Sequence, residues 1–136
     1  GKSYFDAFPK DFSKNVHIVP YIDNMSALIK DIDILVTRAG ASVISEIMAL
    51  GKPSILIPSP YVANNHQYYN AKSLSDANGG IMIEEKDLTK DKLKEEINKL
   101  LTNEKLYKEI SENAKKMSID NSSTLIYEKI KELIKE

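Results

Sequence analysis

Two short apolar runs do most to limit what this chain can fold into. They are Ile34-Leu35-Val36 and Ile55-Leu56-Ile57, and a continuous apolar run of this length is typical of a strand buried on both faces. Between them, residues 42–50 predict a helix that follows Gly40 and ends at Gly51-Lys52-Pro53. Strand, helix and strand form a βαβ unit, in which the strands are parallel and the crossover is right-handed. The sequence therefore predicts an α/β fold with a Rossmann-like parallel sheet flanked by helices.

The same alternation extends to residue 84, and a different pattern follows it. Before that point we expect a short helix or loop in residues 1–15, a strand at Val16–Val19, a helix that is capped by Asp23 or Asn24 and carries Met25, Leu28, Ile29 and Ile32, a helix at about 66–77, and a strand at 81–83. Residues 85–136 predict charged amphipathic helices near 89–102, 104–117 and 122–135, packed by one face. The last helix has an apolar stripe of Ile126, Ile130, Leu133 and Ile134. At 136 residues, the chain is predicted to be one domain.

Composition argues against several kinds of function. The net charge is −1 with acids and bases interspersed, whereas non-specific nucleic-acid binding needs a basic stripe. The chain has no cysteine, which excludes disulfides and thiol chemistry. With two histidines and no HExxH motif a zinc site is not expected, and His17 is expected to pack inside its strand. No apolar run approaches the roughly 20 residues that a membrane-spanning helix needs.

Three loops carry the polar groups that a ligand would need. They are Pro20–Asn24, Thr37–Ser42 and Pro58–His66, and each lies between a predicted strand and the helix that follows it. In a parallel sheet such loops open on one edge, beyond the carboxyl ends of the strands, where ligands of open α/β folds bind. We therefore expect the functional site at this shared edge.

The turn around Gly40 has the features of a phosphate site. Glycine permits a tight turn and a close ligand, and the amides of residues 41–43 would be free at a helix N-terminus. Glu46 lies one turn after Ser42 on the expected open face, where its carboxylate could accept two hydrogen bonds from a vicinal diol such as ribose. Arg38 could face a phosphate. In the alternative reading, Gly40 only makes a turn, Glu46 only favours the helix N-terminus, and Arg38 pairs with a surface acid.

The start of the helix at 66–77 is a second candidate. We expect an asparagine of Asn64-Asn65 to cap it, and His66 and Gln67 in its first turn to reach sugar hydroxyls or a phosphate. The alternative is an ordinary capped surface helix, and no serine or cysteine nucleophile motif surrounds His66. Asp31-Ile32-Asp33 matches the DxD metal motif of some glycosyltransferases. It is expected at the amino edge of the sheet, opposite the site, as a solvated turn.

Taken together, these pieces resemble the C-terminal domain of the MurG family, which are glycosyltransferases of the two-domain GT-B fold in glycosyltransferase family 28. The matching pieces are Thr37-Arg38-Ala39-Gly40-Ala41, Ser45-Glu46-Ile47 with Gly51-Lys52-Pro53, Ile57-Pro58, and Asn65-His66-Gln67 with Asn70-Ala71. Upstream, Tyr21-Ile22-Asp23-Asn24-Met25 looks like the uracil-side turn of the family. The resemblance covers nearly the whole chain, and its specific motifs lie within residues 21–71.

The resemblance implies binding of UDP-N-acetylglucosamine, the donor from which this family makes lipid II out of lipid I in peptidoglycan synthesis. It implies that the backbone of Ile22 contacts the uracil edge, with Tyr21 and Met25 beside the base, and that Glu46 binds the ribose. The diphosphate would be bound by the backbone of Ala41, Ser42 and Val43. His66 and Gln67 would contact the diphosphate and the sugar, and Arg38 would lie near the nucleotide. No metal or other cofactor is implied.

The resemblance also implies that parts of the family's structure are missing from this chain. They are the acceptor-binding N-terminal domain, with the catalytic base, and the glycine-rich loop and first strand of the present domain. We therefore expect the chain alone to be inactive and prone to self-association, and the full protein to be peripheral on the cytoplasmic face of the bacterial inner membrane. Alternatives are another UDP-sugar transferase of this fold, a separate nucleotide-sugar subunit that needs a membrane-bound partner, and a nucleotide-binding module without transfer activity.

Overall fold

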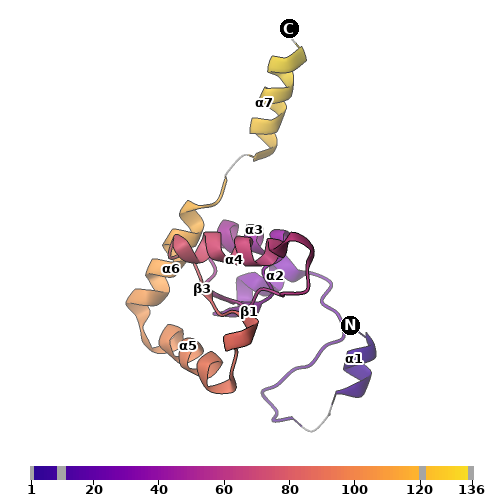
Figure 1. Ribbon diagram of the computed structural model, residues 1–136, viewed down its shortest axis with the longest axis vertical. Helices are drawn as coiled ribbons and strands as arrows, with labels where there is room; N and C mark the ends of the chain where they lie inside the picture. The colour runs from indigo at the N-terminus through magenta and orange to yellow at the C-terminus, as the bar shows by residue number, and fades with distance from the viewer. Residues whose placement is uncertain (1, 9–11, 120–121, 135–136) are drawn as a thin grey trace.

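A parallel three-stranded sheet forms the centre of the molecule (Figure 1). The computed structural model describes residues 2–8, 12–119 and 122–134. The strands are β1 (Leu35–Thr37), β2 (Ser54–Leu56) and β3 (Ile81–Met82), in the order β1-β2-β3, with Val36 opposite Ile55 and Leu56 opposite Met82. The α-helices are α1 (Lys2–Ala7), α2 (Met25–Asp31), α3 (Ala41–Leu50), α4 (His66–Asp76), α5 (Lys90–Thr102), α6 (Glu104–Lys116) and α7 (Ser122–Ile134), and the short 3₁₀ helices are η1 (Ala63–Asn65) and η2 (Glu85–Asp87). The predicted α/β fold is confirmed.

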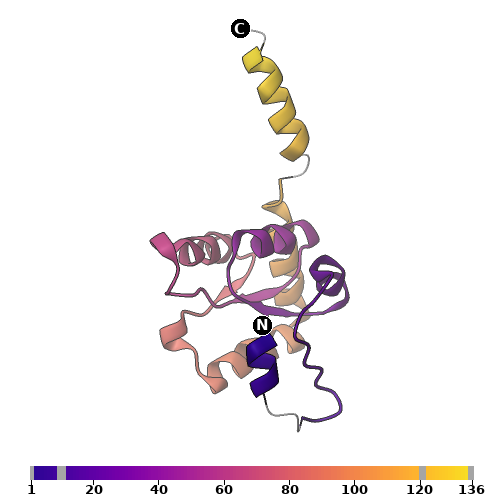
Figure 2. The ribbon, with the colours of Figure 1, turned by 90° about the vertical axis from the view of Figure 1, so that its right-hand side faces the viewer.

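The middle strand β2 holds the two faces of the sheet together. Leu56 packs with Ile47 and Leu74 under α3 and α4, and Ile55 packs with Leu100 under α5. Figure 2 shows α3 and α4 on one face of the sheet and α5 on the other. Burying an aliphatic side chain of this size contributes about 1.5–3 kcal/mol, so β2 anchors both layers.

Helix α6 closes the amino edge of the sheet. Three of its side chains donate to carbonyls that precede the three strands: Tyr107 to Asp33 (3.0 Å), Ser111 to Gly51 (2.6 Å) and Asn113 to Asn78 (3.4 Å). The Asp31–Asp33 turn therefore lies at the amino edge, as predicted. The carboxyl edge, with its loops, is left for function.

Local signals at the helix ends act largely as predicted. Of the two candidate caps for α2, Asn24 is the one used, because its Oδ1 accepts from the amide of Ala27 at 3.0 Å. Gly51 ends α3 in the left-handed conformation, with φ of 60°. Gly40 behaves differently: its φ of −67° and ψ of 149° suit any residue, so the turn itself does not require glycine.

The predicted strand at 16–19 is wrong. Residues 16–19 have no regular secondary structure and are exposed, and none of them pairs with a strand in the described part of the chain. A β-branched run becomes a strand only when a neighbour takes up its backbone hydrogen bonds, and β1 pairs only with β2 among the described residues. His17 is exposed and not packed inside a strand.

Two burial predictions also need correction. Val36 is 40% exposed and does not belong to the apolar cluster that Ile55 forms with Leu100 of α5, so β1 is not buried on both faces. Helix α7 projects from the body in both views, and its predicted apolar stripe, Ile126 to Ile134, is exposed where it was expected to pack (Figures 1 and 2).

Parts of two predicted segments lie outside the described residues. They are residues 1 and 9–11 of the N-terminal segment and residue 135 of the last helix. No helix within the described ranges is long and apolar enough to cross a bilayer.

Replacement of Gly51 by alanine should destabilise the fold. The new Cβ would lie 2.9 Å from the Ser111 carbonyl oxygen, and a left-handed conformation costs a residue with a side chain about 1–3 kcal/mol. Gly40→Ala is the matched control, since its Cβ would meet nothing within 4 Å. We expect thermal unfolding to show a clear drop in the midpoint for Gly51→Ala and almost none for Gly40→Ala. Equal midpoints for the two variants would contradict this account.

Glu96 should make stability depend on pH. This carboxylate is 7% exposed, and burial raises its pKa, but hydrogen bonds from Lys92 and Lys99 hold the pKa below its usual range. A lowered pKa contributes stability above the pKa of the unfolded chain, and this contribution is lost as pH falls through the folded value. Glu96→Gln should therefore destabilise by about 1 kcal/mol at neutral pH, and by less as the pH falls through the lowered pKa of Glu96. Denaturation curves measure this difference. If the wild-type protein and Glu96→Gln differ equally in stability at every pH, the assigned role of Glu96 is wrong.

Candidate functional site

Three helices present their N-termini at the carboxyl edge of the sheet. α3 follows β1 and α4 follows β2, so both start there, and α2 runs down to the amino edge, where β1 begins. α3 packs against both α2 and α4, as Figure 1 shows. The structure thus brings the three predicted loops to one edge. Each helix N-terminus carries a partial positive charge from the helix dipole, which favours an anion.

The turn before α3 offers free amides. The first α-helical bond of α3 joins the amide of Ile44 to the carbonyl of Gly40 at 3.0 Å, so the amides of residues 41–43 have no partner within the helix. Ala41 and Ser42 are exposed, and Val43 is half-buried. The empty space beside Gly40 would let a ligand approach the backbone closely.

Glu46 is less open than the sequence suggested. Val43 and Leu50, three residues before it and four after it, are half-buried, and so is Glu46, while Ser42 and Ser45 are exposed. Glu46 therefore lies on the flank of α3 and not on its outer face. Its Oε2 atom is covered and has no hydrogen-bond partner in the described residues. A covered carboxylate oxygen of this kind is unfavourable unless something else supplies a donor.

The start of α4 is fixed by its own loop. Gln67 Oε1 accepts from the amide of Ser59 at 2.9 Å, and a ring nitrogen of His66, Nδ1, lies 2.9 Å from the carbonyl of Ala63. The expected asparagine cap is wrong: Asn65 precedes α4 but makes no side-chain cap bond. Asn64 and Asn65 both have positive φ, 54° and 52°, a conformation that asparagine tolerates, whereas a capping residue has extended backbone angles.

Asn70 joins two parts of the edge, and the sequence reasoning gave it no role. Its Nδ2 donates to the carbonyl of Ala39 at 3.1 Å, which ties α4 to the turn before α3. Gln67 lies one helical turn before Asn70, so it is on the same side of α4 as that turn. The sequence contains one signal for this role: Asn70 follows Gln67 by three residues, which places both side chains on the same face of a helix.

Arg38 makes the contacts that the alternative reading expected. Its guanidinium donates to the carbonyl of Ile57 at 3.2 Å and forms an ion pair with Glu85 of η2. The acid it pairs with is 47 residues away in the chain, so no local pattern pointed to Glu85. On the α2 side, Tyr21 is 76% exposed, Met25 is 38% exposed and Ile22 is half-buried.

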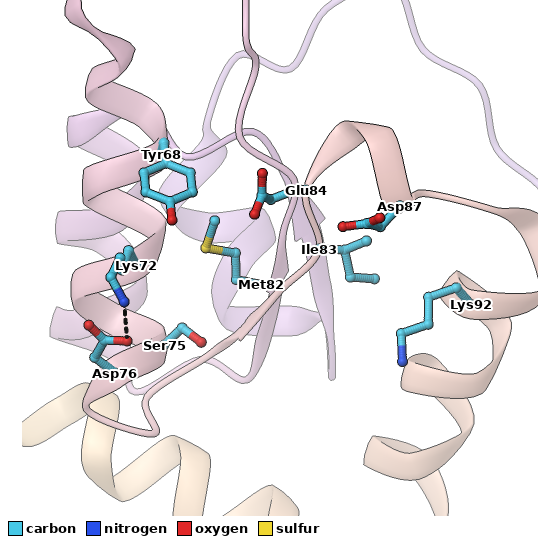
Figure 3. Close-up of a pocket in the computed structure, with 9 residues that line it drawn as sticks. All are labelled: Tyr68, Lys72, Ser75, Asp76, Met82, Ile83, Glu84, Asp87 and Lys92. Atoms are coloured by element: carbon cyan, nitrogen blue, oxygen red, sulfur yellow. Dashed lines mark hydrogen bonds and ion pairs between the residues drawn. The ribbon is translucent and has the colours of Figure 1, made fainter.

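A hollow of about 480 Å³ is lined by α4 on one side and by Lys92 of α5 on the other, with β3 and the segment after it in between (Figure 3). Its lysines already have carboxylate partners: Lys72 pairs with Asp76 at 2.9 Å and Lys92 with Glu96 at 2.7 Å. None of the predicted site residues lines it. Its two lysines are therefore already engaged, and the hollow does not combine free donors with an open carboxylate as the strand edge does. In the part of the chain that the structure describes, no three His, Asp or Glu side chains are grouped as metal ligands.

Comparison with known families decides the relationship. The sequence model of the glycosyltransferase family 28 C-terminal domain matches residues 1–126. The chain belongs to this family. A relative from Caldicellulosiruptor saccharolyticus is 52% identical over 103 residues, which are 76% of this chain and 28% of the relative. One from Acetivibrio thermocellus is 42% identical over 139 residues, covering 99% of this chain and 38% of the relative.

Both relatives carry the name UDP-N-acetylglucosamine–N-acetylmuramyl-(pentapeptide) pyrophosphoryl-undecaprenol N-acetylglucosamine transferase. This family 28 chain thus spans about a third of the length of the curated relatives it matches. The crystal structure of Acinetobacter baumannii MurG superimposes with a TM-score of 0.76 at 24% identity, over 85% of this chain and 35% of that one. The superposition supports the fold, and the predicted family resemblance is confirmed.

Proposed function

We propose that this chain binds the UDP-sugar donor of a glycosyltransferase at the edge where β1 and β2 end. The observation that carries the proposal is Glu46, a half-buried carboxylate whose Oε2 atom has no hydrogen-bond partner among the described residues. It lies on the same helix as the free amides of residues 41–43, one turn further along. A ribose diol at Glu46 and a diphosphate at those amides would satisfy both sets of groups at once.

The other proposed contacts follow the family resemblance. We assign the uracil to the backbone of Ile22 with Tyr21 and Met25, the diphosphate to the backbone of Ala41, Ser42 and Val43, and the diphosphate and sugar to His66 and Gln67. The tie from Asn70 to Ala39 supports this grouping, because it holds the α4 side of the site against the turn. Arg38 lies at the same edge, bound to Glu85.

In the proposed reaction a hydroxyl of the acceptor displaces UDP from the sugar. Negative charge then builds up on the diphosphate as the bond to the sugar breaks. Free amides and the N-terminal dipole of α3 would stabilise that charge without reorganising, and this preorganised stabilisation is often the largest single contribution to catalysis. We place the base that takes the proton of the hydroxyl outside this chain.

For the complete protein we propose the activity that the relatives' name describes. N-acetylglucosamine would pass from the UDP donor to the undecaprenol-linked muramyl pentapeptide, lipid I, and give lipid II. In the complete protein the acceptor would bind the part that corresponds to the unmatched portion of the relatives. Since that acceptor is a membrane lipid, the protein would work as a peripheral protein at the cytoplasmic face of the membrane.

Titration of the complete polypeptide with UDP, UDP-N-acetylglucosamine and UDP-glucose tests donor binding. Glu46→Gln should weaken all three ligands by about tenfold, because a neutral amide replaces a charged acceptor. Gly40→Ala should also weaken them, since the added methyl group meets no protein atom within 4 Å and would meet the ligand. Calorimetry measures both effects.

Glu104→Gln is the matched control for this titration. Glu104 pairs with Lys108 on the surface of α6, at the amino side of the sheet, so the same chemical change there should leave affinity unaltered. A wild-type protein that binds none of the three nucleotides would refute the proposed function. Equal affinity for UDP-N-acetylglucosamine and UDP-glucose would leave UDP binding intact and remove the assignment of the sugar.

We also propose that the chain expressed as residues 1–136 associates with itself. The exposed apolar residues of α7 provide the surface: Leu125, Ile126, Tyr127, Ile130, Leu133 and Ile134. Such a contiguous exposed patch favours association because burying it removes apolar area from water. Sedimentation velocity should show a mass that rises with concentration, and Ile126→Glu/Ile130→Glu should abolish the rise. A monomer at every concentration would contradict the proposal.

A further inference from the structure

One side chain connects the carboxyl ends of all three strands. Arg38 follows β1, its guanidinium donates to the carbonyl of Ile57 just past β2, and it pairs with Glu85 just past β3. The last backbone bond between β1 and β2 runs from the amide of Ile57 to Thr37 at 2.9 Å. In a parallel sheet the amide and the carbonyl of one residue point toward the same neighbouring strand. The carbonyl of Ile57 therefore faces β1, as its amide does. Arg38 therefore supplies the next donor where the backbone pairing stops.

From Ile57 the connection continues to the start of α4. Pro58, which has a fixed φ and no amide, is buried and separates Ile57 from Ser59. The amide of Ser59 donates to Gln67 Oε1 at 2.9 Å. The position of the Ile57 carbonyl thus determines where the Ser59 amide lies, and the hydrogen bond from that amide holds the side chain of Gln67 in one rotamer. With Oε1 bound to the protein, the group that Gln67 keeps for a ligand is its Nε2, a donor.

We propose that Arg38 and Glu85 are positioning residues that act through Ile57 and Ser59 to aim Nε2 of Gln67 at the sugar end of the donor. This rests on the proposed function, since it assumes that the sugar lies at Gln67. Glu85 makes no contact with the donor in this scheme. Its task is to hold the guanidinium over the carbonyl of Ile57.

The exposure of the pair supports a positioning role over a stabilising one. The Arg38 side chain is 51% exposed and that of Glu85 is 31% exposed, and ion pairs this open add little to stability. The fold is held by β2 and α6, so loss of the pair should leave it intact. Its contacts lie instead at the one edge where the ligand is proposed to bind.

A double-mutant cycle in the complete polypeptide tests the scheme. Arg38→Gln and Glu85→Gln should each weaken UDP-N-acetylglucosamine by about tenfold, the effect of one misplaced hydrogen bond, and change UDP by less than about twofold. The double variant should be no weaker than either single variant, because both residues act on the same contact. Glu84→Gln, which removes the neighbouring acid that pairs with Lys86 at 3.1 Å, is the control and should change nothing.

Amide exchange without ligand gives a readout that does not depend on sugar binding. Arg38→Gln and Glu85→Gln should speed exchange at the Ser59 amide by about tenfold, with the amides of β2 unchanged. Unchanged exchange at Ser59 would overturn the proposal. The proposal would also be overturned if the two substitutions caused additive losses of affinity and weakened UDP and UDP-N-acetylglucosamine equally. That result would mean that Arg38 contacts the nucleotide itself. A wild-type protein without affinity for UDP-sugars would refute the donor site, while exchange at Ser59 would still decide whether the pair positions Gln67.

Discussion

The burial of β2 on both of its faces is the constraint on which the rest of the structure depends. Ile55 and Leu56 are completely buried in opposite directions, so helices must cover both faces of the sheet. Covered faces leave only the ends of the strands for polar chemistry. α6 occupies the amino ends through hydrogen bonds to the carbonyls before each strand, and the carboxyl ends remain. The position of the candidate site thus follows from how one three-residue strand is packed.

At that remaining edge the protein leaves particular groups unsatisfied and satisfies others. The amides that begin α3 have no partner in the helix, and Glu46 Oε2 has none in the described protein. Donors and a carboxylate within two turns of one helix suit a ligand with an anionic part and a diol part. By contrast, the hollow beside β3 contains lysines that are already paired, and it lacks this combination.

Much of this architecture was predictable because it depends on local patterns. Short apolar runs, the glycine at the end of α3 and the amphipathic periodicity of α5 and α6 each report a local preference, and the structure agrees with them. Residues 16–19 show the limit of such patterns, since a strand also needs a neighbour that the sequence does not reveal. The same reasoning applies to Val36, because an apolar strand residue is buried only if another element covers its face of the sheet.

The polar contacts across the site were the least predictable. Asn70 and Ala39 are 31 residues apart, and Arg38 and Glu85 are 47 apart, so each pair becomes visible only once the strands are aligned. Arginine and glutamate are also common surface residues, and their presence alone carries no information about a partner. Arg38 and Asn70 both stand within the motif pieces of the sequence, but the motif does not show that Arg38 pairs with Glu85 or that Asn70 donates to Ala39.

The loop between β2 and α4 has a consequence for engineering. It is tied at its start by Ser59 on Gln67 and at its end by His66 on Ala63, while Tyr61 at its tip is 86% exposed. A segment secured at both ends can be exchanged in the middle without disturbing what it connects. Grafted tips of other lengths or chemistries between Pro60 and Val62 would therefore alter the surroundings of the site and leave the register of α4 untouched.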